Sequence, residues 1–269
     1  TNPGSVDSIS GLSKINELIM INQDTVGTSA RSNPASYMKI YDDIRSIISK
    51  VSESKSQGLK PGDFSFNTDG GRCDDCKGDG KKIVEMQFLS DLEVVCDSCN
   101  GKRFNNNILK IKFQGKNINE ILDLTTDEAI VFFQNHNKIV RKLKILSSVG
   151  LGYLSLGQPT NTLSGGESQR IKIAKSLLAK NTKNVLYILD EPSIGLHVDD
   201  LRNLIQTFEF LVGSGNTLLI IEHNIDIIKI ADYIIDIGPG GGNKGGKIIA
   251  SGTIKEVMKN NSSIIKNYL

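Results

Sequence analysis

The chain has 269 residues, enough for one large domain or two smaller ones with a sizeable core. Its 38% hydrophobic and 23% charged residues are ordinary for a globular protein. A formal net charge of +2 is close to neutral, so any patch that binds nucleic acid must be local. No apolar run is long enough to cross a bilayer and no signal peptide is visible, which excludes a membrane role.

In chain order, the first predicted element is a short strand at 18–21. Residues 28 to about 60 are expected to be helical, and residues 70–104 form a glycine- and cysteine-rich module. Residues 108–146 are expected to hold a short strand and then helices. From Leu163 onward the helix and strand patterns alternate, which indicates parallel β/α units.

The central module holds all four cysteines in the pattern C-x2-C-x19-C-x2-C, formed by Cys73, Cys76, Cys96 and Cys99. Four thiolates in two tight turns can close a tetrahedron around one structural Zn²⁺. Free cysteines or a redox pair are poorer interpretations, because two pairs recur with the same spacing. The stretch 83–95 alternates and suits a hairpin. The module then either only stabilises the fold or presents this hairpin to DNA.

The most informative motif is Leu-Ser-Gly-Gly-Glu-Ser-Gln-Arg at 163–170. Ser164 and Glu167 fit a capping box, so a helix should begin here with its amide donors pointing outward. Gly165 and Gly166 have no Cβ, which lets a phosphate approach the backbone. This helix start is therefore predicted to be an anion site.

An apolar run at 185–189 then ends in Asp190 and Glu191, which predicts a buried parallel strand with carboxylates at its ligand-binding end. Asp190 would hold Mg²⁺ through water, and Glu191 would polarise the attacking water. His223, after the next strand at 218–221, would contact the γ-phosphate, and Gln23 would sense Mg²⁺ and that water. Taken singly, an acidic pair is often a solvated loop and a lone histidine is often structural. Their joint order favours an ATP site.

A phosphate-binding loop of the form G-x-x-x-x-G-K-[ST] is missing. The near match at 241–247 is followed by Ile248 and leads into a strand pattern, so it is interpreted as a glycine-rich turn. We therefore expect the chain to begin downstream of the phosphate loop. Alone, it should bind ATP weakly and hydrolyse it negligibly.

These motifs resemble those of the ABC ATPase superfamily. Residues 163–170 resemble its signature, 188–192 its Walker B motif, and 193–197 its D-loop, with Gln23 and His223 as the Q-loop glutamine and the switch histidine. A zinc knuckle between Q-loop and signature resembles the UvrA family of bacterial nucleotide excision repair. The segments that carry this narrower resemblance are Asn22-Gln23, 31–37, 84–89 and 101–105. The stretch 25–28 is looser than the family pattern.

The resemblance implies an α/β fold, with an ABC-type, P-loop NTPase-like core of parallel sheet and helices. It corresponds to the C-terminal part of the second ATPase half of UvrA. Residues 1–27 would belong to the core up to the Q-loop. Residues 28–147 would form a helical insertion with the zinc module at 70–104, and residues 148–269 would return to the core. The implied protein is a cytoplasmic head-to-head dimer that binds damaged duplex DNA, hydrolyses ATP with Mg²⁺ and loads UvrB.

The predicted DNA contacts are basic residues after the Q-loop and on the hairpin. If Tyr41, Ile44 and Ile48 face inward, Arg45 should lie near the exposed edge of its helix. The candidates are Arg31, Lys39, Arg45, Lys81 and Lys82. A solvated helix face is the competing interpretation.

Two other functions fit the same motifs. One is a non-hydrolysing module that binds zinc and DNA. The other is a UvrA-like ABC protein used in antibiotic self-resistance. ATP turnover and preference for damaged DNA separate these alternatives from repair.

Overall fold

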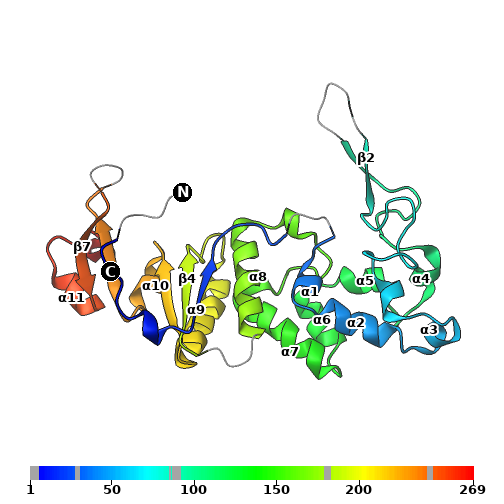
Figure 1. The fold of residues 1–269 in the computed structure, drawn as a ribbon, viewed down its shortest axis with the longest axis horizontal. Coiled ribbons are helices and arrows are strands. Elements are labelled where there is room, and N and C mark those ends of the chain that lie inside the picture. Colours follow the sequence, from blue (N-terminus) through cyan, green and yellow to red (C-terminus); the bar gives the residue numbers. More distant parts are fainter. Residues whose placement is uncertain (1–5, 28–30, 85, 87–91, 179–182, 241–244) are drawn as a thin grey trace.

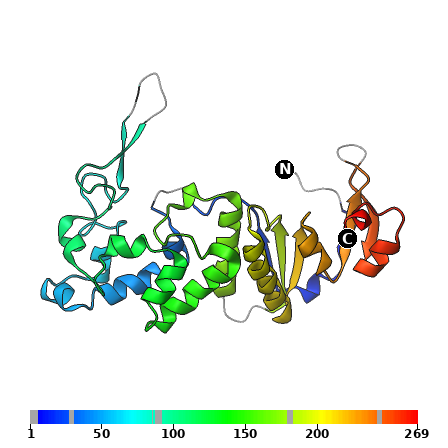
Figure 2. The ribbon, with the colours of Figure 1, turned by 180° about the vertical axis from the view of Figure 1, so that it is seen from behind.

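The computed structural model describes residues 6–27, 31–84, 86, 92–178, 183–240 and 245–269. The molecule is elongated, with the β2–β3 hairpin at one end and β7 and α11 at the other (Figures 1 and 2). The strands are β1 (Glu17–Ile21), β2 (Lys81–Val84), β3 (Leu92–Val95), β4 (Val185–Asp190), β5 (Thr217–Ile221), β6 (Ile234–Gly238) and β7 (Lys247–Gly252). The α-helices are α1 (Pro34–Tyr37), α2 (Tyr41–Ile48), α3 (Ser52–Ser56), α4 (Asn106–Lys110), α5 (Ile118–Leu122), α6 (Thr126–Phe132), α7 (Asn137–Leu146), α8 (Gly165–Leu178), α9 (Val198–Gly213), α10 (Ile225–Lys229) and α11 (Ile254–Lys259).

The central sheet is parallel, with strand order β1-β4-β5. Alternate residues of β4 (Val185, Tyr187 and Leu189) are fully buried, as a strand covered on that face requires. The opposite face carries exposed apolar side chains on β1 and β5, among them Met20 and Ile221. The predicted strands at 18–21, 185–189 and 218–221 are therefore confirmed.

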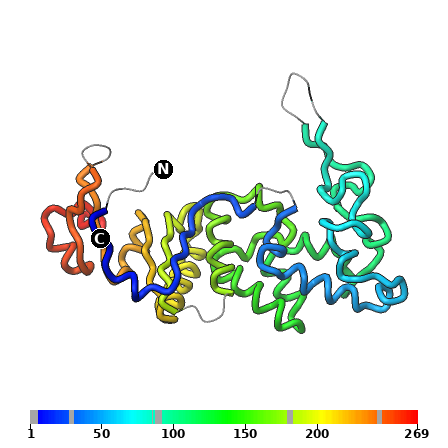
Figure 3. Tube along the Cα trace, viewed as in Figure 1, coloured from blue at the N-terminus to red at the C-terminus, as the bar shows by residue number. Residues whose placement is uncertain are grey.

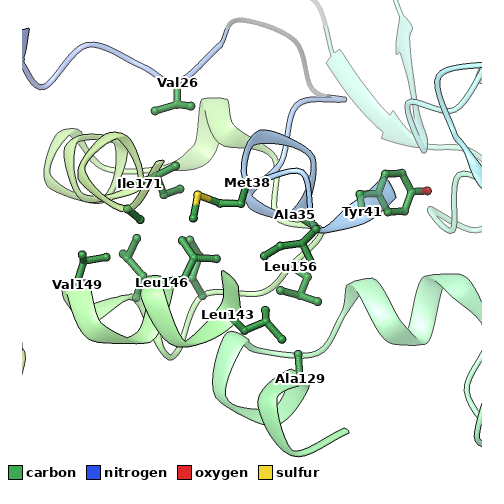
Figure 4. Close-up of a cluster of buried hydrophobic side chains, with 14 of the residues drawn as sticks. Val26, Ala35, Met38, Tyr41, Ala129, Leu143, Leu146, Val149, Leu156 and Ile171 are labelled. Carbon is green, nitrogen blue, oxygen red and sulfur yellow. The ribbon is translucent and has the colours of Figure 1, made fainter. Parts of the chain in front are cut away.

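A hydrophobic core joins the helical part to the sheet. Figure 4 shows Met38 of the segment after α1, Leu146 of α7 and Ile171 of α8 converging in it. All three are fully buried. The chain after β1 runs along α8 before it enters the helical part (Figure 3), and Val26 from this stretch joins the same core.

Helix α7 leads into a π-helical turn at Ser147–Leu151, in which Val149 and Gly150 leave helical geometry. This turn contacts α8 and α9. The expected boundary at residue 147 falls at this turn, where α7 ends and helical geometry is interrupted, and it stays a prediction.

Three expectations differ from the structure. The helical stretch after residue 28 is broken into α1, α2 and α3. Lys39, with a positive φ of 53°, separates α1 from α2, and the extended residue Val51 separates α2 from α3. The strand expected within 108–146 is only an isolated bridge between Phe113 and Lys116, surrounded by helices. Strands β6 and β7 are antiparallel, so the parallel β/α pattern ends at β5. Most of the glycine-rich turn at 241–247 lies outside the described residues.

Candidate nucleotide and metal sites

The polar residues that follow β1, β4 and β5 gather at one edge of the sheet, because parallel strands end on the same side. The register pairs Ile21 with Leu189, and Asp190 with Ile221, so the strands end level with one another. The Nδ1 atom of His223 lies 3.4 Å from Oε1 of Glu191. The structure therefore brings these two predicted residues together.

The backbone at Glu191 makes this approach possible. Its amide donates to the carbonyl of Ile221 at 2.8 Å, which ties the end of β4 to the end of β5. Its φ of 46° lies in the left-handed region, an uncommon conformation for a glutamate. This turn directs the chain away from the sheet directly after Asp190.

The signature helix begins as predicted. Glu167 Oε2 accepts the amide of Ser164 at 2.7 Å, and the amide of Glu167 donates to Ser164 Oγ at 3.2 Å, which completes a capping box. Burial alone would raise the pKa of Glu167, but hydrogen bonds from Tyr153 and Ser164 outweigh it and lower the pKa.

Close contacts explain both glycines of the signature. A Cβ on Gly165 would lie 3.1 Å from Oε1 of Gln23, so the predicted Q-loop residue packs against the helix start. A Cβ on Gly166 would lie 2.6 Å from the carbonyl oxygen of Ile194, in the turn after β4. Gln23, the signature and the Ser193–His197 turn therefore form one packed unit.

Two residues that the sequence analysis gave no role hold this unit together. Gln169 is fully buried, and its Nε2 donates to the carbonyls of Ile21 at 3.1 Å and Asp190 at 2.7 Å. Glu222 accepts the amide of Ser193 at 2.9 Å. The sequence held a signal for both, because Gln169 lies within the 163–170 motif and Glu222 directly precedes His223.

The other two histidines have different partners. His197 is exposed, with its Nδ1 3.8 Å from a carboxylate oxygen of Asp199 at the start of α9. His136 packs among aromatic rings, with its centroid 5.6 Å from Phe113 and 6.0 Å from Phe133. Its surroundings explain it as a structural residue.

The cysteines form a second site at the base of the β2–β3 hairpin. The ligand atoms of Cys73, Cys76, Cys96 and Cys99 all lie within 4.8 Å of one another and are buried. The amide of Gly80 donates to the sulfur of Cys76 at 3.2 Å. A hydrogen bond from the backbone amide of Cys99 lowers the pKa of Cys96 to about 7, whereas burial raises the pKa of Cys73 and of Cys99. Four converging sulfurs fit a closed tetrahedral metal site.

Three of the candidate DNA contacts pair with acidic side chains within the chain. Arg31 Nε lies 2.8 Å from Oδ1 of Asp79, in the turn that follows Cys76. Lys81 Nζ lies 2.7 Å from Glu93 across the hairpin, and Lys82 Nζ lies 3.7 Å from Asp75. Both lysines thus sit at the base of the hairpin, beside the cysteines.

Arg45 is half-buried at the edge of α2, and its role in DNA binding stays a prediction. Its side chain is only 21% exposed and is paired with Asp42. It also stacks 5.2 Å from the centre of the Tyr41 ring, which draws the guanidinium inward. Lys39, by contrast, is exposed.

Comparisons with known proteins agree with this geometry. UvrABC system protein A of Aquifex aeolicus is 52% identical over 266 residues, covering 99% of this chain and 29% of that protein. The Bacillus subtilis protein of the same name is 50% identical over 267 residues. The crystal structure of UvrA2 from Deinococcus radiodurans superposes with a TM-score of 0.89 and 41% identity, over 96% of this chain and 32% of that one. No family model matches the chain.

The parallel sheet, the signature helix beside its strand ends and the cysteine-rich insertion define an ABC-type ATPase core. Within this class the chain has the sequence and the fold of UvrA over nearly its whole length. It spans about 29% of the length of the Aquifex aeolicus protein. Among the described residues, no helix is both long and apolar enough to span a membrane.

The capping box predicts a pH-dependent stability. Replacing Glu167 with Gln should lower the free energy of unfolding by about 0.5–1 kcal/mol at neutral pH. Because the folded-state pKa of Glu167 lies below its ordinary 4.5, its contribution is full above that value and is lost as pH falls through the folded pKa. Urea unfolding from pH 7 to pH 3 measures this. The exposed Glu209→Gln serves as control, and a difference that stays constant with pH would contradict the role of the carboxylate.

Proposed function

We propose that this chain is part of a DNA-damage-recognition ATPase of nucleotide excision repair, which binds ATP, Mg²⁺ and DNA and loads UvrB. The observation that carries the proposal is the match to UvrABC system protein A along nearly the whole chain, cysteine module and signature included. The gathering of Gln23, Asp190, Glu191 and His223 at the strand ends supports an ATPase. The whole protein acts in the cytoplasm as a dimer.

The strand-end residues have separate tasks in this proposal. Asp190 would hold Mg²⁺ through water, and the ion would supply positive charge against the phosphates. Glu191 takes up the proton of the attacking water, and a carboxylate suits this task because it accepts without donating. His223, 3.4 Å from Glu191, contacts the γ-phosphate. Gln23 orients the water.

The signature serves a different nucleotide. Ser164, Gly165, Gly166 and Glu167 lie at the start of α8, and the N-terminus of a helix suits a phosphate. In ABC dimers each signature faces the phosphate loop of the opposing half. The sequence contains no G-x-x-x-x-G-K-[ST] motif, so the chain alone should bind ATP weakly and hydrolyse it negligibly, and its signature would serve a nucleotide held by a different ATPase half.

Zinc content is the first test of the cysteine site. Protein purified under reducing, chelator-free conditions should contain about one Zn²⁺ per chain, held by four thiolates. Chelation should unfold at least residues 70–104, because metal binding and folding are coupled. Metal analysis and far-UV circular dichroism measure both.

A matched pair of substitutions sharpens the zinc test. Cys96→Ser removes one sulfur and should lose the metal. Ser98→Ala, in the same turn as Cys96, removes a hydroxyl that hydrogen-bonds Asp75 of the other cysteine turn, and this variant should keep the metal. Zinc-free wild-type protein, or equal zinc in both variants, would refute the site.

ATP turnover tests the role of Glu191. In the full-length protein, Glu191→Gln should keep ATP binding and lower kcat by about a hundredfold or more, because the water loses its base. Glu209→Gln, an exposed change on α9, is the control. Turnover equal to wild type in Glu191→Gln would remove this residue from the catalytic role.

DNA binding is expected to depend on basic side chains at the end of the molecule that carries the cysteine module. The proposed contacts are Arg31, Lys39, Arg45, Lys81 and Lys82. In the intact dimer, Lys39→Gln should weaken binding to damaged and undamaged duplex alike, and should reduce the salt slope by roughly one unit. We expect a smaller effect from Arg45→Gln, because that side chain is only 21% exposed.

The control and the hairpin variants complete the DNA experiment. Lys255→Gln changes an exposed lysine on α11, at the opposite end of the molecule from the cysteine module (Figure 1), and should leave the slope unchanged. Replacing Lys81 and Lys82 should change the ratio of damaged to undamaged binding. If no variant changes the affinity for DNA or its dependence on salt, these basic side chains face solvent and do not contact DNA. Wild-type protein without damage preference would favour the self-resistance function.

A further inference from the structure

Glu222, the first residue after β5, accepts backbone hydrogen bonds at both carboxylate oxygens. Its Oε1 accepts the amide of Ser193 at 2.9 Å. Its Oε2 accepts the amides of His223 at 3.0 Å and Asn224 at 3.1 Å. A carboxylate suits this arrangement because it accepts at both oxygens and donates at neither.

The three amides belong to two different strand ends. Ser193 follows β4, directly after the Asp190-Glu191-Pro192 turn, whereas His223 and Asn224 follow β5. A second link joins the same strand ends, from the amide of Glu191 to the carbonyl of Ile221 at 2.8 Å. The Glu222 carboxylate and the Glu191–Ile221 hydrogen bond thus both join the two strand ends that carry Glu191 and His223.

The turn that Glu222 holds at Ser193 also contacts the signature helix. The residue after Ser193 is Ile194, whose carbonyl accepts from Nη1 of Arg170 at 3.4 Å. That carbonyl also lies so close to Gly166 that an added Cβ would be 2.6 Å away. A shift of Ser193 would therefore disturb the start of α8 as well as the strand ends.

We propose that Glu222 is a positioning residue for ATP hydrolysis. It fixes the backbone of His223 so that the imidazole meets Glu191, and it ties this pair to the turn that packs on the signature helix. The inference rests on the proposed ATPase function. A glutamine at this position would place its NH₂ group, a donor, against a backbone amide that is also a donor. The hydrogen bonds at one of the two oxygens of Glu222 would then be lost.

The test uses the full-length protein with ATP, measured in steady state and single turnover. Glu222→Gln should lower kcat roughly tenfold to a hundredfold with little change in KM, because the reacting groups lose alignment while nucleotide binding remains. Zinc content should stay at the wild-type level. Glu222→Asp keeps both acceptor oxygens on a shorter side chain and should lose less, and Glu209→Gln should behave as wild type.

A double-mutant cycle separates positioning from general structural damage. If Glu222 acts through His223, then Glu222→Gln should cause little further loss in a His223→Gln background. Wild-type kcat in Glu222→Gln, or losses that multiply in the double variant, would overturn the proposal. If Glu222→Gln does not fold, Glu222→Asp runs through the same cycle with the same criteria. Failure of the ATPase function itself is distinct, since Glu191→Gln would then leave turnover unchanged.

Discussion

The amide of Gln169 fixes the relative position of the signature helix and the strands that carry the acidic pair. It is fully buried and donates to the carbonyls that end β1 and β4, at Ile21 and Asp190. A slip of one residue between these strands would turn their side chains to the other face and withdraw one of these carbonyls. The strand register, the helix start and the Glu191–His223 contact therefore depend on one another.

The cysteine module is joined to the rest by arginines. Arg31, in the segment between β1 and α1, pairs with Asp79 of the module at 2.8 Å. Arg103 donates to the carbonyl of Gly157 at 3.3 Å and lies 5.4 Å from the centre of the Phe66 ring. These contacts tie the module to the segment before α1 and to Gly157, so unfolding of the module would remove them.

Much of the fold and of the site could be predicted because the deciding patterns are local. The capping box at Ser164 and Glu167 needs partners only three residues apart, and both of its hydrogen bonds are present. The apolar run before Asp190 can bury its side chains only as a central strand. The paired cysteine spacing similarly requires two sulfur-bearing turns, and the four sulfurs converge.

The sequence by itself thus determined the strands of the central sheet, where the signature helix begins and which sulfurs meet. Tertiary structure decided which charged side chains are paired within the chain and which remain available to bind a ligand. Arg45 stacks on Tyr41, Arg31 pairs with Asp79, and Glu222 captures the amide of Ser193. The last two contacts join residues 48 and 29 positions apart, and they exist only because packing brings separate segments together. Periodicity along the chain carries no information about such partners.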